Sequence, residues 1–252
     1  EIGEMPRTVP ADLDDFPDYK ERLAKLGATP KYHRPICRGE IRVKDLGSLH
    51  KDIANLKAAA AMPGVTEAFM NAASPGLITA FQVNRHYPSH EAYLADLADA
   101  MREEYETIVN AGFYLQLDCP DLAMSRHTGY QDMDEAGFLA TIRANVDALN
   151  QATADIDPQA MRMHVCWGNY EGPHDFDIPL EKIIDIVLSA RPATILFEHA
   201  NPRHEHEWKV WADAKLPSHK ILAPGMIDTC SNYVEHPELI AQRIERFAGI
   251  VG

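Results

Sequence analysis

Short runs of β-forming residues alternate with amphipathic helical segments along most of this chain, and this alternation restricts the fold more than any other feature. The candidate strands are residues 35–41, 67–73, 114–118, 161–167, 194–198 and 220–227. Between them, apolar residues recur at three- and four-residue steps, as from Leu94 to Ile108, and Gly112 then predicts a helix stop. Strands that alternate with helices are typical of a parallel sheet covered by helices, so the pattern predicts an α/β protein.

The length favours one domain of the (βα)8 TIM-type barrel. Such barrels commonly have about 250 residues, and this chain has 252, of which 46% are hydrophobic. A seventh strand is expected at residues 2–4, which leaves at least one of the eight strands to lie outside this chain. We therefore expect one barrel domain over residues 1–252, incomplete as given, with residues 7–32 as an irregular, partly helical excursion.

Composition excludes several classes of partner. The net charge of −14 offers no basic surface for nucleic acid, and no apolar run approaches the roughly 20 residues that span a membrane. The four cysteines lie far apart in a chain too long to need disulfides, so we expect reduced thiols and a cytoplasmic location. The sequence leaves the oligomeric state open.

His164 and Cys166 are the first candidate metal ligands. They stand two residues apart in an apolar strand, so their side chains point to the same face. Imidazole and thiolate together are a zinc-type pair, although two such residues can also meet in a strand through packing alone. Glu198 ends the next strand and adds a carboxylate, which could instead cap a helix or pair with an arginine. In a barrel these positions share the catalytic rim.

Two further groups of polar residues lie near strand ends. Asp118, followed by Asp121, suits general acid or base work or the binding of an ammonium group, while a helix cap and turn is the alternative. The stretch from Asn201 to Trp208 contains His204 and His206, which either contact substrate or enter the first turn of a helix. The sequence has no Gly-rich phosphate loop, G-x-S-x-G elbow or H-E-x-x-H helix.

These motifs, in their order, resemble the catalytic domain of cobalamin-independent methionine synthase and its short relatives, including epoxyalkane:coenzyme M transferase. The matching motifs are Gly3-Glu4-x-x-Arg7, Gln116-Leu117-Asp118-x-Pro120, His164-x-Cys166, Phe197-Glu198, Asn201-Pro202-Arg203-His204-x-His206-Glu207-Trp208, and Gly225-Met226-Ile227-Asp228 followed by Val234-Glu235-His236-Pro237-Glu238. The resemblance implies a UROD/MetE-like barrel, of which this chain would be a version truncated at both ends.

The resemblance also implies a set of roles. His164, Cys166 and Glu198 would bind zinc, and Glu4 and Asp118 would line the pocket of a thiol substrate such as homocysteine. Asn201 and His204 are further candidate substrate-binding residues, and Asp118 is also a candidate catalytic residue. Coordination to zinc deprotonates a thiol, which predicts alkyl or methyl transfer from a donor to that thiol. The partners would be a small-molecule thiol and an alkyl donor.

Two departures from the family concern sulfur. The family has a further zinc-binding Cys, in an Asp-Cys-Gly setting, beyond the position equivalent to Gly252. Cys230 stands where methionine synthase has a catalytic His, so it is a candidate catalytic residue, a replacement ligand, or neither. Two alternatives to alkyl transfer stay open: a zinc lyase or hydrolase that uses zinc-bound water, and a non-catalytic barrel that binds a small thiol or pterin.

Overall fold

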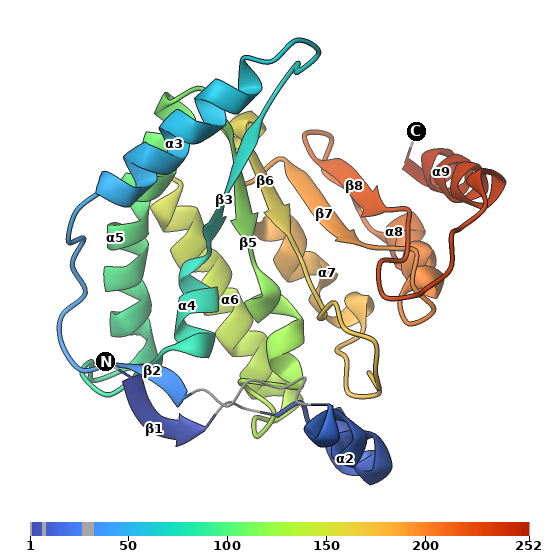
Figure 1. Cartoon of the computed structure of the whole chain (residues 1–252), viewed down its shortest axis with the longest axis horizontal. Helices are drawn as coiled ribbons and strands as arrows, with labels where there is room; N and C mark the ends of the chain where they lie inside the picture. Colours follow the sequence, from blue (N-terminus) through green and yellow to red (C-terminus); the bar gives the residue numbers. More distant parts are fainter. Residues whose placement is uncertain (1, 7–8, 27–32, 252) are drawn as a thin grey trace.

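The computed structural model describes residues 2–6, 9–26 and 33–251, and the side chains of residues 2–6 and 33 are outside this description. Strands and helices alternate along these residues (Figure 1). The strands are β1 (Ile2–Pro6), β2 (His33–Cys37), β3 (Phe69–Ala73), β4 (Val83–Asn84), β5 (Tyr114–Asp118), β6 (Met161–His164), β7 (Thr194–Glu198) and β8 (Ile221–Gly225). The α-helices are α1 (Asp12–Asp15), α2 (Pro17–Lys25), α3 (Gly47–Ala60), α4 (Pro75–Phe81), α5 (His90–Asn110), α6 (Glu135–Ala152), α7 (Leu180–Ser189), α8 (Trp208–Asp213) and α9 (Pro237–Val251). The short 3-10 helices are η1 (Pro120–Leu122), η2 (Met124–Arg126), η3 (Pro158–Ala160) and η4 (Glu205–Glu207).

Five parallel strands form the main sheet, in the order β3-β5-β6-β7-β8. Each pair of neighbours is joined by a connection that contains at least one helix, as parallel pairing requires. The predicted α/β class and parallel sheet are confirmed. The carboxyl ends of these strands lie at one edge of the sheet, where Asp118 pairs with His164 across β5 and β6.

A second sheet has β2 at its centre. β1 pairs antiparallel with β2, and β4 pairs parallel with β2. Within the described residues no strand pairing joins the two sheets, so the ring of a (βα)8 barrel is not closed. The fold is a five-stranded barrel wall accompanied by a separate three-stranded sheet.

One face of the main sheet packs against helices. Leu115 and Leu117 on β5 are fully buried, whereas Gln116 between them is half-buried on the opposite face. This difference follows from the two-residue period of a strand. Helices α5, α6 and α7 contribute residues such as Tyr105, Phe138 and Ile183 to the same core. Figure 1 shows α6 and α7 behind the sheet, which leaves the other face turned toward the viewer.

Local signals at the helix ends agree with the sequence. Ser89 caps α5 by accepting a hydrogen bond from the Ala92 N–H at 3.2 Å, and Asp134 caps α6 by accepting from the Gly137 N–H at 2.7 Å. The predicted stop at Gly112 is confirmed, since this glycine adopts a φ of 90° just after α5. A positive φ favours glycine because it has no Cβ.

Several strand boundaries differ from the predictions. β2 covers residues 33–37 rather than 35–41, and the two-residue β4 was too short to predict. β6 ends at His164 rather than residue 167, although the Val165 N–H still donates to the Leu196 carbonyl at 2.9 Å. Cys166 therefore lies just beyond the strand. The predicted excursion contains α1 and α2, which are helical.

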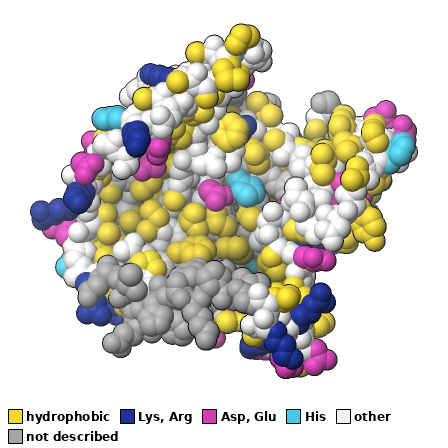
Figure 2. Space-filling model, viewed as in Figure 1, with side chains coloured by type: hydrophobic (Ala, Val, Ile, Leu, Met, Phe, Trp, Pro, Cys, Tyr) yellow, Lys and Arg dark blue, Asp and Glu magenta, His cyan; other side chains and the backbone are white. Residues whose placement is uncertain are grey.

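The front face is hollowed. Figure 2 shows hydrophobic side chains gathered on this face between α3, α5 and the carboxyl edge of the sheet, with an acidic side chain and a histidine side chain near the middle. Across the described residues, no helix is long and apolar enough to cross a membrane.

Candidate functional site

The ends of β5 and β6 bring Asp118 and His164 into contact. The two residues are register partners on adjacent strands, and His164 Nδ1 lies 2.7 Å from Asp118 Oδ1. Burial lowers the pKa of His164, but hydrogen bonds with Asp118 and Cys166 outweigh it and raise the pKa to about 10. This contact occupies Nδ1 and leaves Nε2 for another partner.

Cys166 lies two residues farther along, in the turn that follows β6. Its Sγ accepts a hydrogen bond from the Gly168 N–H at 3.3 Å. Gly168 has a φ of 108°, which lets the chain turn back beside the cysteine. The Gly168 N–H thus fixes the position of a sulfur that lines the same cavity as His164.

Glu198 ends β7 with one oxygen paired and the other free. Its Oε2 accepts hydrogen bonds from the Asn201 amide and from Arg203, whose Nη2 is 3.3 Å away. Its Oε1 is buried and has no hydrogen-bond partner among the described residues. Because an unpaired buried carboxylate oxygen is costly, this atom indicates a missing cation or donor.

These side chains line one cavity, which we call the rim pocket. Its volume is ≈ 290 Å³. The residues that line it are His164, Cys166, Asn169, Leu196, Phe197, Glu198, His199, Ala200, Asn201, Ala223, Gly225, Ile227, Asp228, Thr229 and Cys230. The rim pocket thus contains the three predicted zinc ligands together with Asn201 and Cys230.

Cys230 faces the rim pocket from the loop after β8. Its thiol donates a hydrogen bond to Asn169 Oδ1 at 2.7 Å, and its backbone N–H donates to Asp228 Oδ1 at 3.0 Å. Burial raises the pKa of the Cys230 thiol, Arg203 opposes that shift, and the charges of Asp228 and Glu198 reinforce it. Cys230 is therefore a thiol that keeps its proton.

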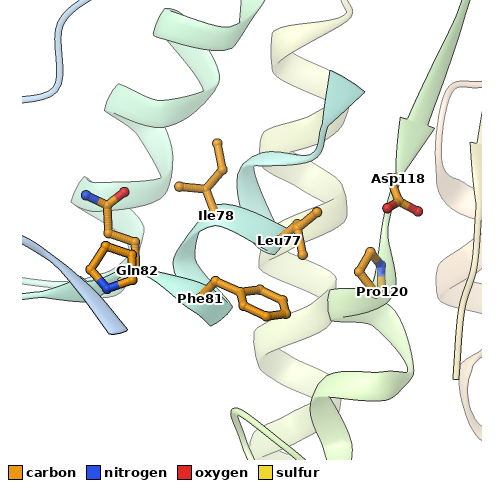
Figure 3. Close-up of a pocket in the computed structure, with 7 residues that line it drawn as sticks. Leu77, Ile78, Phe81, Gln82, Asp118 and Pro120 are labelled. Carbon is orange, nitrogen blue, oxygen red and sulfur yellow. The ribbon is translucent and has the colours of Figure 1, made fainter. Parts of the chain in front are cut away.

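Asp118 also borders a second cavity, of ≈ 480 Å³, which we call the apolar pocket. Figure 3 shows Leu77, Ile78 and Phe81 of α4 on one side and Asp118 with Pro120 on the other. The carboxylate lies between the two cavities, because it borders the apolar pocket and contacts His164 of the rim pocket.

One predicted residue, His204, lies outside both pockets. His204 is buried and lines neither pocket; its Nδ1 contacts Glu207 at 2.9 Å and its Nε2 contacts Asp177 at 3.1 Å. His204, which was predicted to contact substrate, therefore contacts the carboxylates of Glu207 and Asp177 instead. Glu4 lies on β1, and its side chain is outside the described residues.

Sequence reasoning missed two residues of the site. Asn169 is exposed and accepts hydrogen bonds from the side chains of Thr229 and Cys230. Arg203 pairs with Glu198 and also donates to the Gly168 and Tyr170 carbonyls. Arg203 lies within the motif from Asn201 to Trp208, whereas nothing in the sequence distinguished Asn169.

The donor set of the rim pocket fits zinc in its chemistry: an imidazole, a thiol and a carboxylate with an unpartnered oxygen. In the described part of the chain, however, the group whose three ligand atoms all lie within 4.8 Å of one another is His127, His174 and Asp177. The rim pocket would have to tighten around an ion. No disulfide forms among the four cysteines.

Known proteins give a consistent comparison. No family model matches the chain. Methionine synthases from Pyrococcus horikoshii and Pyrococcus furiosus are 27% and 26% identical over 173 residues, and one from Saccharolobus solfataricus is 24% identical over 177 residues. Each match covers 68% of this chain, which spans only 43–44% of the length of these relatives.

A solved structure matches nearly the whole chain. It is a B12-independent methionine synthase from Shewanella sp. W3-18-1 in complex with selenomethionine, with a TM-score of 0.65 at 14% identity. The match covers 97% of this chain and 63% of that one, and it supports the fold alone. Taking the sequence matches and this fold together, the chain is a distant homologue of the cobalamin-independent methionine synthases.

Proposed function

We propose that this protein transfers a methyl or related alkyl group to the sulfur of a small-molecule thiol in the rim pocket, with zinc held by His164, Cys166 and Glu198. The observation that carries this proposal is Oε1 of Glu198, which is buried in the cavity that His164 and Cys166 line and has no hydrogen-bond partner in the described part of the chain. The homology to methionine synthases supports the same reaction class.

The three side chains offer one nitrogen, one sulfur and one oxygen, which zinc accepts in catalytic sites. When bound, zinc would lower the pKa of a coordinating substrate thiol and thus supply a thiolate near neutral pH. The residues around the ligands favour this arrangement. Arg203 and the Asn201 amide hold Oε2 of Glu198, so Oε1 is the oxygen left for the metal.

Asp118 has a positioning role. By accepting the Nδ1–H of His164 at 2.7 Å, its carboxylate leaves Nε2 as the ring nitrogen that would bind a metal. A carboxylate behind a metal-binding histidine is a recurrent outer partner, and it fixes both the tautomer and the ring orientation. Asp118 is also placed to contact a donor in the apolar pocket.

The rim pocket is large enough for a small thiol, and homocysteine is the acceptor that we favour. The related Shewanella structure holds selenomethionine, the selenium analogue of methylated homocysteine. We expect Glu4 to bind the amino group of this acceptor. Asn201 would act through Glu198, since its amide donates to that carboxylate.

We place the alkyl donor in the apolar pocket, next to Leu77, Ile78 and Phe81 (Figure 3). In the transfer, the thiolate sulfur forms a bond to the alkyl carbon as the bond from that carbon to its leaving atom breaks. The leaving atom takes the electron pair and then requires a proton. Cys230 Sγ holds a proton at the rim pocket and is our candidate source. The reduced cysteines fit the cytoplasmic location that we expect.

The first test is zinc analysis coupled to a transfer assay. Purified protein should bind zinc and convert homocysteine to an alkylated product, detected by mass spectrometry, with a folate-type, epoxide or methylated small-molecule donor. His164→Ala and Cys166→Ser should lose the transfer activity and the zinc ion of the rim pocket, while His206→Ala, at an exposed histidine, should keep both. The proposal is wrong if the His164 and Cys166 variants retain rim-pocket zinc, or if no thiol alters the optical spectrum of the cobalt-substituted site.

A further inference from the structure

A second group of metal-binding side chains lies outside the rim pocket, and we call it the His127 cluster: Asp12, His127, His174 and Asp177. Asp12 begins α1, His127 follows η2, and His174 and Asp177 belong to the loop between β6 and α7. None of the four lines the rim pocket or the apolar pocket.

The side chains of the cluster converge. Ligand atoms of His127, His174 and Asp177 all lie within 4.8 Å of one another. His127 Nδ1 is 2.9 Å from Asp12 Oδ2 and 3.3 Å from Asp177 Oδ1, and His174 Nδ1 is 3.0 Å from Asp177 Oδ2. Two imidazoles therefore face two carboxylates in one small volume.

Water hardly reaches this cluster. The side chains of His127 and His174 are each 1% exposed, and that of Asp12 is 0% exposed. Two carboxylates at this depth need compensating positive charge, because an isolated buried charge is strongly unfavourable. A divalent cation would supply that charge at one point.

Several atoms of the cluster lack hydrogen-bond partners. Asp12 Oδ2, both ring nitrogens of His127 and Nε2 of His174 are buried and unpartnered among the described residues. Asp12 Oδ2 and His127 Nδ1 are thus close to each other without being aligned as donor and acceptor. Buried polar atoms normally have hydrogen-bond partners, and coordination to an ion is one recognised way to satisfy those that do not.

We propose that His127, His174 and Asp177, together with Asp12, bind a zinc ion that fastens α1 to the loops after β5 and β6. His127, His174 and Asp177 give three convergent ligand atoms, and Asp12, whose Oδ2 lies 2.9 Å from His127 Nδ1, would supply the fourth for a four-coordinate ion. His204 adds an outer contact, because its Nε2 lies 3.1 Å from Asp177 Oδ2.

Neighbouring contacts show what the ion would hold together. Asp12 Oδ1 accepts a hydrogen bond from the Phe176 N–H at 2.8 Å, and the Ala11 N–H donates to the His127 carbonyl at 2.8 Å. The Tyr19 hydroxyl donates to the Glu171 carbonyl. The segment 9–26 is therefore already fixed to both loops at the cluster, and zinc would add a cross-link among the same elements.

The test separates this site from the rim pocket by removing the latter. In the double variant His164→Asn/Cys166→Ser, we expect about one zinc ion to remain per chain. Adding His174→Gln should remove it, and adding His90→Gln, at a half-buried histidine outside the cluster, should not. In the double variant, cobalt should give ligand-field bands without a sulfur-to-metal charge-transfer band, since the cluster contains no cysteine.

Proteolysis gives a second readout that a metal-free hydrogen-bond network would not produce. Trypsin should cleave at Lys20, Arg22 or Lys25 of α2 more slowly when zinc is present than after chelation. Asp177→Asn should abolish this zinc dependence while circular dichroism confirms that the sheet and helices persist. The proposal is overturned if the double variant binds no zinc, if His174→Gln retains the ion, or if zinc leaves the cleavage rate unchanged.

Discussion

The rim pocket and the His127 cluster both combine imidazoles with carboxylates. They differ in exposure to solvent and in the elements that supply their histidines. The His164 side chain is 33% exposed and sits at a strand end, whereas the His127 side chain is 1% exposed and sits in a loop. An open site can admit substrate and leave a coordination position free. A closed site, in which protein side chains fill every coordination position of the ion, suits a structural role. The two sites thus differ in burial as well as in the thiol that only the rim pocket contains.

The largest effect is expected from Cys166→Ser in the rim pocket. Loss of a direct ligand should reduce zinc affinity and thiol alkylation by more than about 100-fold, beyond what loss of an outer partner costs. Zinc titration and the transfer assay measure it. Cys37→Ser, at a buried cysteine of the other sheet, is the matched control. Equal losses in both variants would trace the effect to general destabilisation rather than to the pocket.

Asp12→Asn tests whether the His127 cluster attaches α1 to the loop after β6. The change weakens a fully buried contact between α1 and the loop after β6, and it should destabilise that attachment by about 2–3 kcal/mol. Denaturant unfolding and tryptic cleavage of α2 report it. Asp15→Asn, in the same helix but exposed, should change neither measurement. An unchanged cleavage rate in Asp12→Asn would refute the idea that the cluster holds this segment.

Asp118→Asn tests whether a residue behind a proposed zinc ligand of the rim pocket affects zinc affinity. Asparagine keeps the size of the side chain but weakens its hold on the His164 ring, so zinc affinity should fall by about tenfold. Competition with a chelator measures this fall, and Asp132→Asn at an exposed position is the control. Wild-type affinity in Asp118→Asn would mean that the carboxylate does not position the imidazole.

The smallest effect on metal binding is expected at Asp121, a buried carboxylate three residues after Asp118. Ser74 and Asn145 donate hydrogen bonds to it at 2.8 and 2.9 Å, yet burial raises its pKa to about 6 from an ordinary value of 3.8. The folded state then holds a proton that the unfolded state releases between these values. This group therefore makes the folded state less stable as pH rises from about 4 to 6.

Asp121→Asn should remove that contribution, which is about 2 kcal/mol across the window. Denaturation of the two proteins at pH 4, 5 and 6 measures the difference between their slopes. Parallel slopes would mean that Asp121 titrates normally in spite of its burial. Burial would then have no measurable effect on the pKa of this carboxyl group.

Local sequence patterns predicted the elements well because period and end signals act over a few residues. The strands β3, β5, β7 and β8 lie inside the predicted runs, and α5 begins and ends where Ser89 and Gly112 indicate. Strand ends also identified His164, Cys166 and Glu198 as neighbours, since parallel strands place their carboxyl ends along one edge. The sequence predicted a barrel that is incomplete in this chain, but not the division of the described strands into two sheets, because strand pairing between distant segments is specified by no local pattern.

The sequence by itself determined the α/β alternation and which polar residues stand at strand ends as candidates for the site, because both arise from short-range periodicity. Only the tertiary structure decided how loops meet. It placed Cys230 beside Asn169, left Oε1 of Glu198 without a partner, and turned His204 toward Asp177. It also gathered Asp12, His127 and His174 from distant segments into one buried cluster. Loop packing depends on contacts between residues far apart in the chain, which spacing along the sequence does not encode.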